Sequence, residues 1–338
     1  MTNKSNTRRT FLKKAAVGSA AIGLLNPAWS WASRNEVDKG KRVGIIGLDT
    51  SHSTAFTKVL NAADASPDYA GYKIVAAYPY GSRDIESSSK RIPGYIEEVK
   101  KLNVEIVDSI DDLLKKVDVV LLETNDGRLH KEQAIQVLKA GKRVFIDKPI
   151  AASLSDVVAI FEASRQYKVP LFSASSLRYI KGIESIDKSQ VVGADTFSPA
   201  VLEKTHPDLF WYGIHGVETL YTVMGTGCRN VVRVHTDGTD VVIGTWADGR
   251  VGTFRGTRTG KHDYGGTVYT QNGNVKLGPY GGYEPLLKEI INYFETGNVP
   301  VKPEETIEIF AFMEAADESK RRGGAAVSLE SVMSKLKK

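Results

Sequence analysis

One short loop in the sequence combines residue types that could bind a phosphate. Residues 47–52, GLDTSH, follow the apolar run RVGII and lead into a helical pattern, which is the position of the glycine-rich loop in dinucleotide-binding βαβ units. In that loop the first glycine permits a tight turn, the second lets the backbone approach the diphosphate, and the third lets the helix pack on the strand. Gly47 holds the first position, but Asp49 and His52 hold the second and third.

These two departures leave three interpretations open. Amides at the amino end of the following helix attract anions, and Thr50, Ser51 and Ser53 could donate to phosphate, which favours a nicotinamide dinucleotide in an adjusted position. A carboxylate at Asp49 would instead face the diphosphate and oppose it by bulk and charge, or it could cap the helix. The loop therefore binds such a cofactor, binds another ligand, or binds none.

The elements that would position this loop alternate between strand and helix. Apolar runs at 42–48, 72–80, 104–109, 117–124, 143–149 and 169–175 are separated by helical patterns, which predicts a doubly wound parallel sheet. Beyond about residue 180, short alternating segments separated by Asp-Gly, Thr-Gly and Asn-Gly turns predict an antiparallel sheet, and two long helical patterns follow. We predict an α/β fold with a Rossmann domain at 33–170 and an α+β domain at 171–338.

Composition excludes several classes of partner and site. The chain has 338 residues and a net charge of +5, with basic residues interleaved among 40 acids, so nucleic acid is not an expected partner. Cys228 is the only cysteine, which rules out an intramolecular disulfide and a zinc site built from cysteines. His52, His206 and His235 show no metal-ligand spacing, so no metal is predicted, although a site formed across the domains stays open.

The amino terminus predicts export. Arg8 and Arg9 precede an apolar run of about 11 residues, shorter than the roughly 20 that a membrane-spanning helix needs. We interpret residues 1–32 as a twin-arginine signal peptide that is cleaved before Ser33, leaving no stable membrane anchor and a periplasmic protein. A frayed amphipathic terminus is the alternative.

Four stretches resemble the Gfo/Idh/MocA oxidoreductases, the family of glucose-fructose oxidoreductase and inositol dehydrogenase. They are RVGIIGL at 42–48, the segment 117–151, WYGIHGVETLYTVMG at 211–225, and the carboxyl-terminal segment 283–329. The resemblance implies a Rossmann domain followed by an open, mostly antiparallel sheet that often builds an oligomer interface. It also implies an NAD or NADP cofactor and a sugar or cyclitol substrate.

The same resemblance implies two catalytic residues. The family's E-K-P motif places a lysine beside the nicotinamide, and here it corresponds to Asp147, Lys148 and Pro149. The family's D-x-G-x-H motif supplies a histidine acid or base, which corresponds to His215. Trp211 replaces the aspartate of that motif. Glu218, one helical turn beyond His215, is predicted to orient the imidazole.

Further site residues are expected around these two. The second strand ends without the carboxylate that usually reads the ribose, and Arg83 after it could meet a 2′-phosphate, which would favour NADP, or could be a solvated loop charge. The family pattern places Asn125 and His130 near the cofactor and Arg178 near the substrate, while Trp211 and Tyr212 could stack on a sugar. His130 and Arg178 have structural roles as alternatives.

These observations support three functions. The first is an exported homo-oligomeric oxidoreductase that moves hydride between NAD(P) and a sugar or cyclitol hydroxyl, with Lys148 and His215 handling the proton. The second is a lyase or hydrolase on keto-sugars or glycosides that uses the same pair without an exchanging nicotinamide. The third is a non-catalytic carbohydrate-binding relative.

Overall fold

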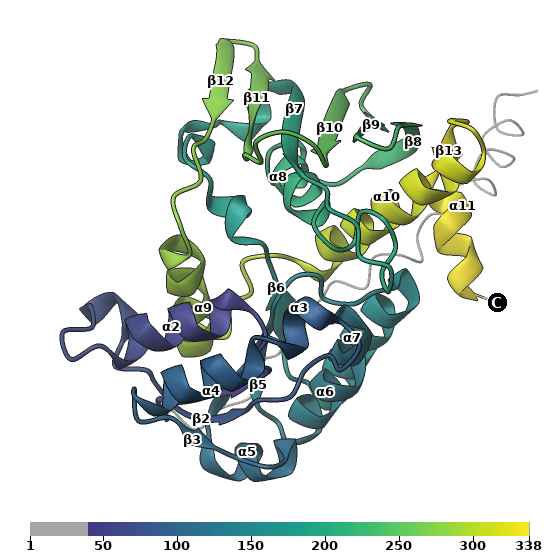
Figure 1. Ribbon diagram of the computed structural model, residues 1–338. Coiled ribbons are helices and arrows are strands. Elements are labelled where there is room, and N and C mark those ends of the chain that lie inside the picture. Colours follow the sequence, from purple (N-terminus) through teal and green to yellow (C-terminus); the bar gives the residue numbers. More distant parts are fainter. Residues whose placement is uncertain (1–39, 338) are drawn as a thin grey trace, which may run out of the picture. The chain divides into compact units, whose positions relative to one another are not determined.

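The computed structural model describes residues 40–337, which form two sheets and the helices around them (Figure 1). The predicted signal peptide, residues 1–32, and the predicted cleavage before Ser33 lie outside the described residues and stay predictions. Within residues 40–337, no helix is both long enough and apolar enough to cross a bilayer.

The first sheet has six parallel strands in the order β3-β2-β1-β4-β5-β6, which confirms the predicted doubly wound sheet. Its strands are β1 (Arg42–Ile46), β2 (Lys73–Tyr78), β3 (Glu105–Ile106), β4 (Val119–Leu122), β5 (Arg143–Ile146) and β6 (Leu171–Ser173). The helices between them are α2 (Ser51–Asn61), α3 (Glu86–Ser89), α4 (Ile92–Lys100), α5 (Ile110–Lys116), α6 (Gly127–Lys139) and α7 (Leu154–Tyr167).

Local sequence explains where these elements begin and how they pack. Every residue of β4 is buried, as expected for a continuous apolar run that helices cover on both faces. Side chains of Ser109, Asp126 and Ser153 accept hydrogen bonds from backbone amides in the first turns of α5, α6 and α7. Each of these caps fixes the start of a helix by pairing an amide that the helix itself leaves free.

The strand order reverses between β1 and β4, because β1 pairs with β2 on one side and with β4 on the other. Open α/β sheets bind ligands at the carboxyl ends of their strands beside such a switch point. The segments that follow β1, β4 and β5, at 47–52, 123–126 and 147–149, therefore meet at this edge of the sheet.

The second sheet has seven strands in the order β12-β11-β7-β10-β9-β8-β13, and all neighbours are antiparallel except β7 and β10. The predicted open, mostly antiparallel sheet is confirmed. Its strands are β7 (Val191–Pro199), β8 (Cys228–His235), β9 (Thr239–Trp246), β10 (Val251–Thr257), β11 (Gly265–Thr270), β12 (Gly273–Leu277) and β13 (Val327–Ser328).

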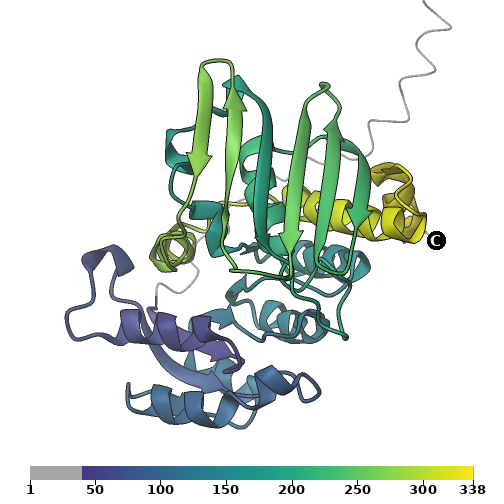
Figure 2. The same cartoon turned by 45° about the horizontal axis from the view of Figure 1, so that its top comes forward.

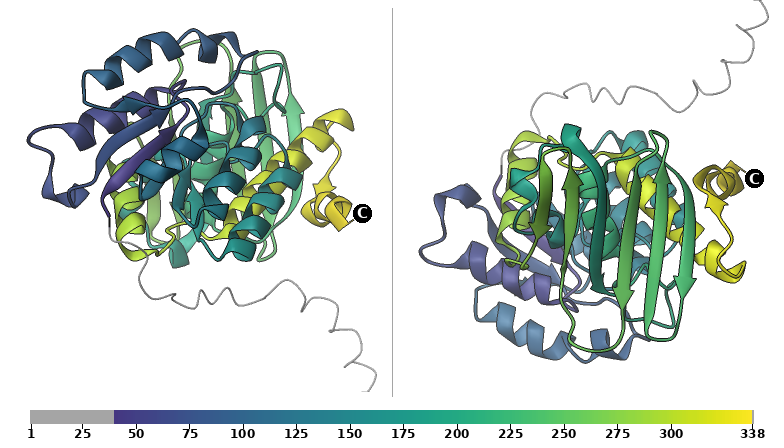
Figure 3. Two further views of the ribbon diagram at one scale, coloured as in Figure 1. Left: turned by 90° about the horizontal axis from the view of Figure 1, so that it is seen from below. Right: turned by 90° about the horizontal axis from the view of Figure 1, so that it is seen from above.

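One face of the second sheet is covered by helices α8 (Ile214–Met224) and α10 (Pro303–Arg321) (Figure 2). Every residue of α8 is buried, because the helix lies between β7, β10 and α10. The opposite face has no helix of the described residues across it, as the right panel of Figure 3 shows. The chain closes with α11 (Leu329–Met333).

Helix α9 (Glu284–Thr296) packs against the first sheet although it follows the second in sequence. Its Leu287, Ile290 and Phe294 share one apolar core with Val43 of β1 and Phe172 of β6. A segment of the predicted second domain, 171–338, thus completes the core of the first. The domain division at residue 170 stays a prediction, and α9 shows that the two parts are joined by shared packing.

Candidate functional site

The phosphate loop keeps the turn of a dinucleotide site. Gly47 has φ +91°, and a Cβ there would lie 2.5 Å from the backbone nitrogen of Thr124, so only glycine fits. Helix α2 begins four residues later with Thr50 as its N-cap, yet no side chain caps its first amides. The Thr50 hydroxyl is buried and has no hydrogen-bond partner within the described residues. The amino end of α2 is therefore free to receive an anion.

Asp49 points away from this anion position, which corrects both sequence interpretations of it. Its side chain is fully buried, with one oxygen 2.9 Å from the amide of Asn125 and the other 3.3 Å from the amide of Ser82. Asp49 accepts hydrogen bonds from the loops after β2 and β4 and so connects them to the loop after β1. It therefore neither faces a diphosphate nor caps α2. Desolvation by burial raises the pKa of Asp49 to about 6, although the two amides oppose the shift.

A pocket of about 100 Å³ lies at the carboxyl edge of the first sheet. Residues between 176 and 283 line its other side. Seven of the predicted site residues line it: Thr50, Ser51, His52, Asn125, Lys148, Tyr212 and His215. Six lining residues were not predicted: Arg91, Ser176, Leu177, Tyr264, Tyr280 and Tyr283. The three tyrosines lie in the loops around β11 and β12, and aromatic residues in glycine-rich loops are the signal that would have pointed to them.

Lys148 and His215 converge on this pocket from different parts of the fold. Lys148 follows β5 and is mostly buried, with Nζ 5.9 Å from the ring centroid of Tyr212. His215 lies in the first turn of α8, and its Nδ1 is 2.7 Å from the hydroxyl of Ser175. Burial, and secondarily the charge of Lys148, holds the pKa of His215 well below its ordinary value. The imidazole is therefore neutral near pH 7 and can act as a base.

Glu218 and Arg178 form a buried network behind the pocket. Glu218 accepts from the amide of Ser175 at 2.9 Å and from Nε of Arg178 at 2.9 Å, while Arg178 also donates to Glu305 at 2.6 Å. Glu218 binds the amide of Ser175, whose hydroxyl contacts His215, so the role of Glu218 in orienting the imidazole stays a prediction. Arg178 donates to two carboxylates and does not line the pocket, and its contact with the substrate stays a prediction.

Other predicted residues lie outside the pocket lining. His130 is fully buried, with Nε2 2.6 Å from the carbonyl of Thr124, which is its structural alternative rather than a cofactor contact. Trp211 is buried against His206, with ring centroids 4.9 Å apart, so core packing replaces the predicted sugar stacking. Arg83 is exposed and lines a second pocket of about 370 Å³ just beyond β2, on the side where a dinucleotide site reads the ribose.

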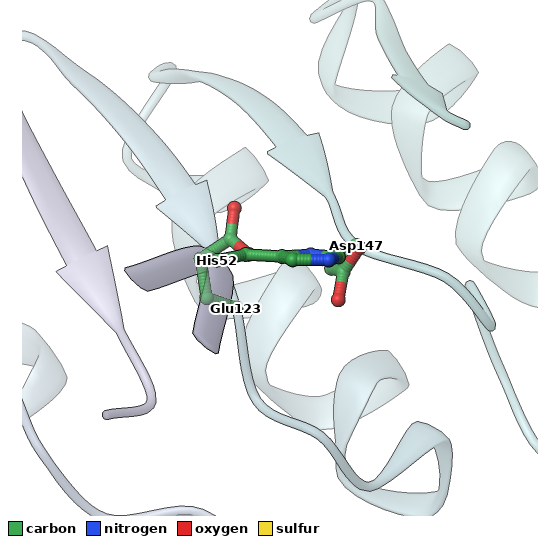
Figure 4. Close-up of side chains that lie close together, drawn as sticks. All are labelled: His52, Glu123 and Asp147. Atoms are coloured by element: carbon green, nitrogen blue, oxygen red, sulfur yellow. Dashed lines mark ion pairs between the residues drawn. The ribbon is translucent and has the colours of Figure 1, made fainter. Parts of the chain in front are cut away.

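The fold also assembles a cluster that sequence reasoning missed (Figure 4). Nδ1 of His52 lies 3.0 Å from Oδ1 of Asp147 and 3.7 Å from Oε2 of Glu123. His52 has no metal-ligand spacing in the sequence, and the sequence therefore predicts no metal there. The signal that could have found the cluster is that Glu123 and Asp147 each end a buried strand of the parallel sheet, so both carboxylates reach the same edge.

Comparison with known proteins finds a family likeness in the part of the chain that forms the first sheet. Residues 41–175 match the model of the Gfo/Idh/MocA oxidoreductase family, NAD-binding Rossmann fold. An inositol 2-dehydrogenase of Serratia proteamaculans is 30% identical over 108 residues, 31% of this chain and 32% of that protein. A 2,7-anhydro-N-acetylneuraminate hydratase of Escherichia coli is 30% identical over 99 residues, 28% of this chain and 26% of that protein.

The fold likeness extends further than the sequence likeness. The crystal structure of scyllo-inositol dehydrogenase from Lactobacillus casei, with bound NAD(H) and scyllo-inositol, aligns with a TM-score of 0.69 over 86% of this chain and 99% of that chain. The identity is 14%, so the alignment shows a shared fold. The chain spans between 23% and 38% of the length of the curated relatives it matches.

The residues at the amino end of α2 fit a nicotinamide dinucleotide. Gly47 keeps the tight turn, the first amides of α2 are not capped, and the unpartnered hydroxyl of Thr50 lies beside them in the pocket lining. The carboxyl of Asp49, which would repel a diphosphate, is turned inward. Thr50 and Ser51 with the α2 amides would hold the diphosphate, and Lys148 would lie on the nicotinamide side.

Proposed function

We propose that this protein is an NAD(P)-dependent oxidoreductase acting on a hydroxyl or ketone of a sugar or cyclitol. The observation that carries the proposal is the convergence of Lys148 and His215 in one pocket with the uncapped amino end of α2. A proton-transfer pair beside an anion-binding helix end is the arrangement that hydride transfer to a nicotinamide needs.

The chain's own residues would handle the proton and the substrate. The bound cofactor would accept or donate the hydride. Lys148 would hydrogen-bond the reacting oxygen, and its charge would stabilise negative charge developing there. His215, when its Nδ1–H donates to Ser175, presents Nε2 as the base that takes the hydroxyl proton. Tyr212, Tyr264 and Tyr280 would offer ring faces and hydroxyls to a polyhydroxylated ring.

Two observations support the substrate class. The pocket lining is dominated by hydroxyl, imidazole and ammonium groups, which suit a ligand with many hydroxyls. The named relatives include an inositol 2-dehydrogenase, and a structure of the same fold holds scyllo-inositol. A small polyol or sugar is therefore the substrate class that we would test first.

The direct test is to denature the purified full chain and measure NAD(H) and NADP(H) in the supernatant. We expect nucleotide in near-stoichiometric amount, or saturable binding of added NAD(P)H. Arg83→Ser should then weaken NADP binding more than NAD binding, because only NADP offers a 2′-phosphate to the guanidinium. If no nucleotide is found, none binds, and no polyol is oxidised, the proposal fails.

A redox-neutral lyase or hydratase is the second candidate, and the hydratase among the relatives favours it. Lys148 and His215 could remove a proton beside a ketone and protonate a leaving oxygen without net oxidation. Incubation with a keto-glycoside separates the two functions. Release of the aglycone with no change in nicotinamide absorbance would support the lyase, whereas a stoichiometric absorbance change would support the oxidoreductase.

We further propose that the protein is exported by the twin-arginine route and works in the periplasm as a homo-oligomer. Paired Arg8 and Arg9 before a short apolar run support export. The uncovered face of the second sheet supports oligomerisation, since Val192, Phe197 and Val251 are 40–48% exposed there. Cell fractionation of the wild type and of Arg8→Lys/Arg9→Lys tests the first point. Sedimentation of Val192→Glu/Val251→Glu, with Val201→Glu as control, tests the second.

A further inference from the structure

Two buried carboxyl groups lie together at the carboxyl edge of the first sheet. Glu123 follows β4 and Asp147 follows β5, and both side chains are 0% exposed. Neither oxygen of Glu123 has a hydrogen-bond partner within the described residues, and the side-chain contact of Asp147 is its 3.0 Å ion pair with His52. Burying an ionised carboxylate is costly unless hydrogen bonds or an opposite charge compensate it. The pair therefore indicates a ligand that these side chains would share.

His52 supplies a third ligating atom. It is mostly buried, and its Nδ1 also lacks a hydrogen bond although it lies 3.0 Å from Asp147 and 3.7 Å from Glu123. One ligand atom from each residue lies within 4.8 Å of the other two. Ligands at about 2.1 Å from a tetrahedral metal are about 3.4 Å apart, so the observed separations match a common metal centre. Figure 4 shows the imidazole lying between the two carboxyl groups.

We propose that His52, Glu123 and Asp147 bind one divalent transition-metal cation, Zn²⁺ or Mn²⁺. One imidazole nitrogen with two carboxylates suits these borderline cations. Ca²⁺ prefers six to eight oxygen ligands and does not fit this set. His52 also lines the pocket, whereas the two carboxyl groups do not, so the cation would lie under the pocket floor with its open coordination position toward the pocket.

The cation would act on the site chiefly by positioning and charge. Asp147 is bonded directly to Lys148, so a metal bond to its carboxylate would restrain the backbone that carries the lysine. It would also neutralise the charge of Glu123 and Asp147, two carboxylates that interact electrostatically with that ammonium group. The imidazole would be fixed by its metal bond while its ring stays 4.5 Å from the ring of Tyr283 in the pocket lining. This inference does not depend on the proposed oxidoreductase activity.

A shared proton is the competing explanation for the same geometry. A protonated Glu123 beside an ionised Asp147 paired with His52 would also lower the cost of burial. The two explanations differ in what Glu123→Gln does. Glutamine reproduces a neutral acid in size and leaves a shared-proton cluster intact, but it removes a charged metal ligand.

The experiment uses the full chain, stripped with a chelator and then titrated with Zn²⁺ or Mn²⁺ in the absence of nucleotide and substrate. We expect one cation per chain by calorimetry and elemental analysis, with a rise of several degrees in Tm at saturating cation. Glu123→Gln and Asp147→Asn should lower the affinity about 100-fold or more. His206→Gln, a buried histidine beside Asp126 that lies outside the cluster, should bind the cation as the wild type does.

The outcomes decide between the explanations without reference to turnover. Absence of stoichiometric binding by the wild type, with no change in Tm, overturns the proposal. Unchanged affinity in both carboxyl variants also overturns it, because the cation then binds elsewhere. A wild type that binds no cation stoichiometrically, together with a Glu123→Gln chain that is as stable as the wild type, would establish the shared proton instead.

Discussion

The two sheets each bury a cluster of charged side chains, and the clusters differ in how their polar atoms are paired. Behind the second sheet, all three guanidinium nitrogens of Arg233 donate to carboxylates, to Asp240 and Asp208 at 2.8 Å and to Asp317 at 2.5 Å. At the edge of the first sheet, the carboxyl oxygens of Glu123 and Asp147 have no hydrogen bond within the described residues.

The difference distinguishes a structural cluster from a functional one. A buried charge whose hydrogen bonds are all made within the protein has no capacity left for a ligand, and its role is to hold β8, β9 and α10 together. A buried charge left without hydrogen bonds is costly to keep and marks a place where something else binds. The Glu218 and Arg178 network belongs to the first kind, which is why neither residue reaches the pocket.

The largest expected effect comes from removing Lys148 beside the incompletely paired cluster. Lys148→Ala should lower kcat/KM for polyol oxidation by about 10²- to 10⁴-fold, because the reacting oxygen loses its proton-transfer and charge partner. The Tm should fall far less than the activity, since the ammonium group makes no direct ion pair among the described contacts and interacts with Glu123 and Asp147 only through its charge. Steady-state kinetics and calorimetry measure the two effects, with Lys131→Ala as control. A large loss of stability with retained activity would make Lys148 a structural residue.

The reverse pattern is expected for Arg233, whose three guanidinium nitrogens all donate to carboxylates. Arg233→Met should lower the free energy of unfolding by about 3–5 kcal/mol, because three carboxylates lose their shared buried partner. Lys320→Met removes a partly exposed partner of Asp208 and should cost less than about 1 kcal/mol. Chemical denaturation measures both. Equal effects of the two substitutions would contradict the distinction between the clusters.

A smaller effect is expected at Asp49, whose carboxyl is hydrogen-bonded but has no opposite charge bound to it. Its pKa is about 6 in the folded protein and 3.8 in the unfolded reference, so its stabilising contribution is complete below pH 3.8 and is lost as the pH rises through 6. The difference amounts to about 3 kcal/mol. Asp49→Asn should remove this part of the pH dependence of unfolding between pH 4 and 7.5. Asp64 is exposed, so Asp64→Asn should leave the pH dependence of unfolding unchanged.

The smallest effect concerns the pH profile set by His215. Because burial holds its pKa well below the ordinary value, the imidazole stays neutral as the pH falls through 6.5. The rate of substrate oxidation should therefore stay level through pH 6.5 and decline only in more acidic solution. A pH profile of kcat/KM of the wild type tests this. An acid limb centred near pH 6.5 would show that the imidazole is not buried as described.

The parallel sheet was the most predictable part of the molecule. Its strands are continuous apolar runs such as VVLL at β4, and alternating helices leave few other topologies. The second sheet was predictable from its turn sequences and from the short alternating segments between them. The packing of α9 on the first sheet was not predictable, because an amphipathic helix carries no mark of which apolar surface it will cover.

The residues of the candidate site also fall into two groups, those that the sequence predicted and those that it did not. Gly47, Lys148 and His215 could be named from local motifs, because each stands at a fixed place next to a strand or helix. The inward direction of Asp49 could not, since it depends on amides of Ser82 and Asn125 that lie far away in sequence. Ser175 as the partner of His215, and Glu305 as the partner of Arg178, are likewise results of tertiary packing.

The sequence by itself determined the order of strands and helices, the anion-binding loop and the two residues that would move a proton, because these depend on neighbours within a few positions. Only the tertiary structure decided how the charged side chains pair, because long-range packing selects which buried groups meet. It paired Arg233 with three carboxylates and Arg178 with two, and it brought His52, Glu123 and Asp147 together across 95 residues with carboxyl oxygens that lack hydrogen bonds. The cluster of His52, Glu123 and Asp147, which the sequence could not reveal, is therefore the one whose unpaired atoms indicate a bound ligand.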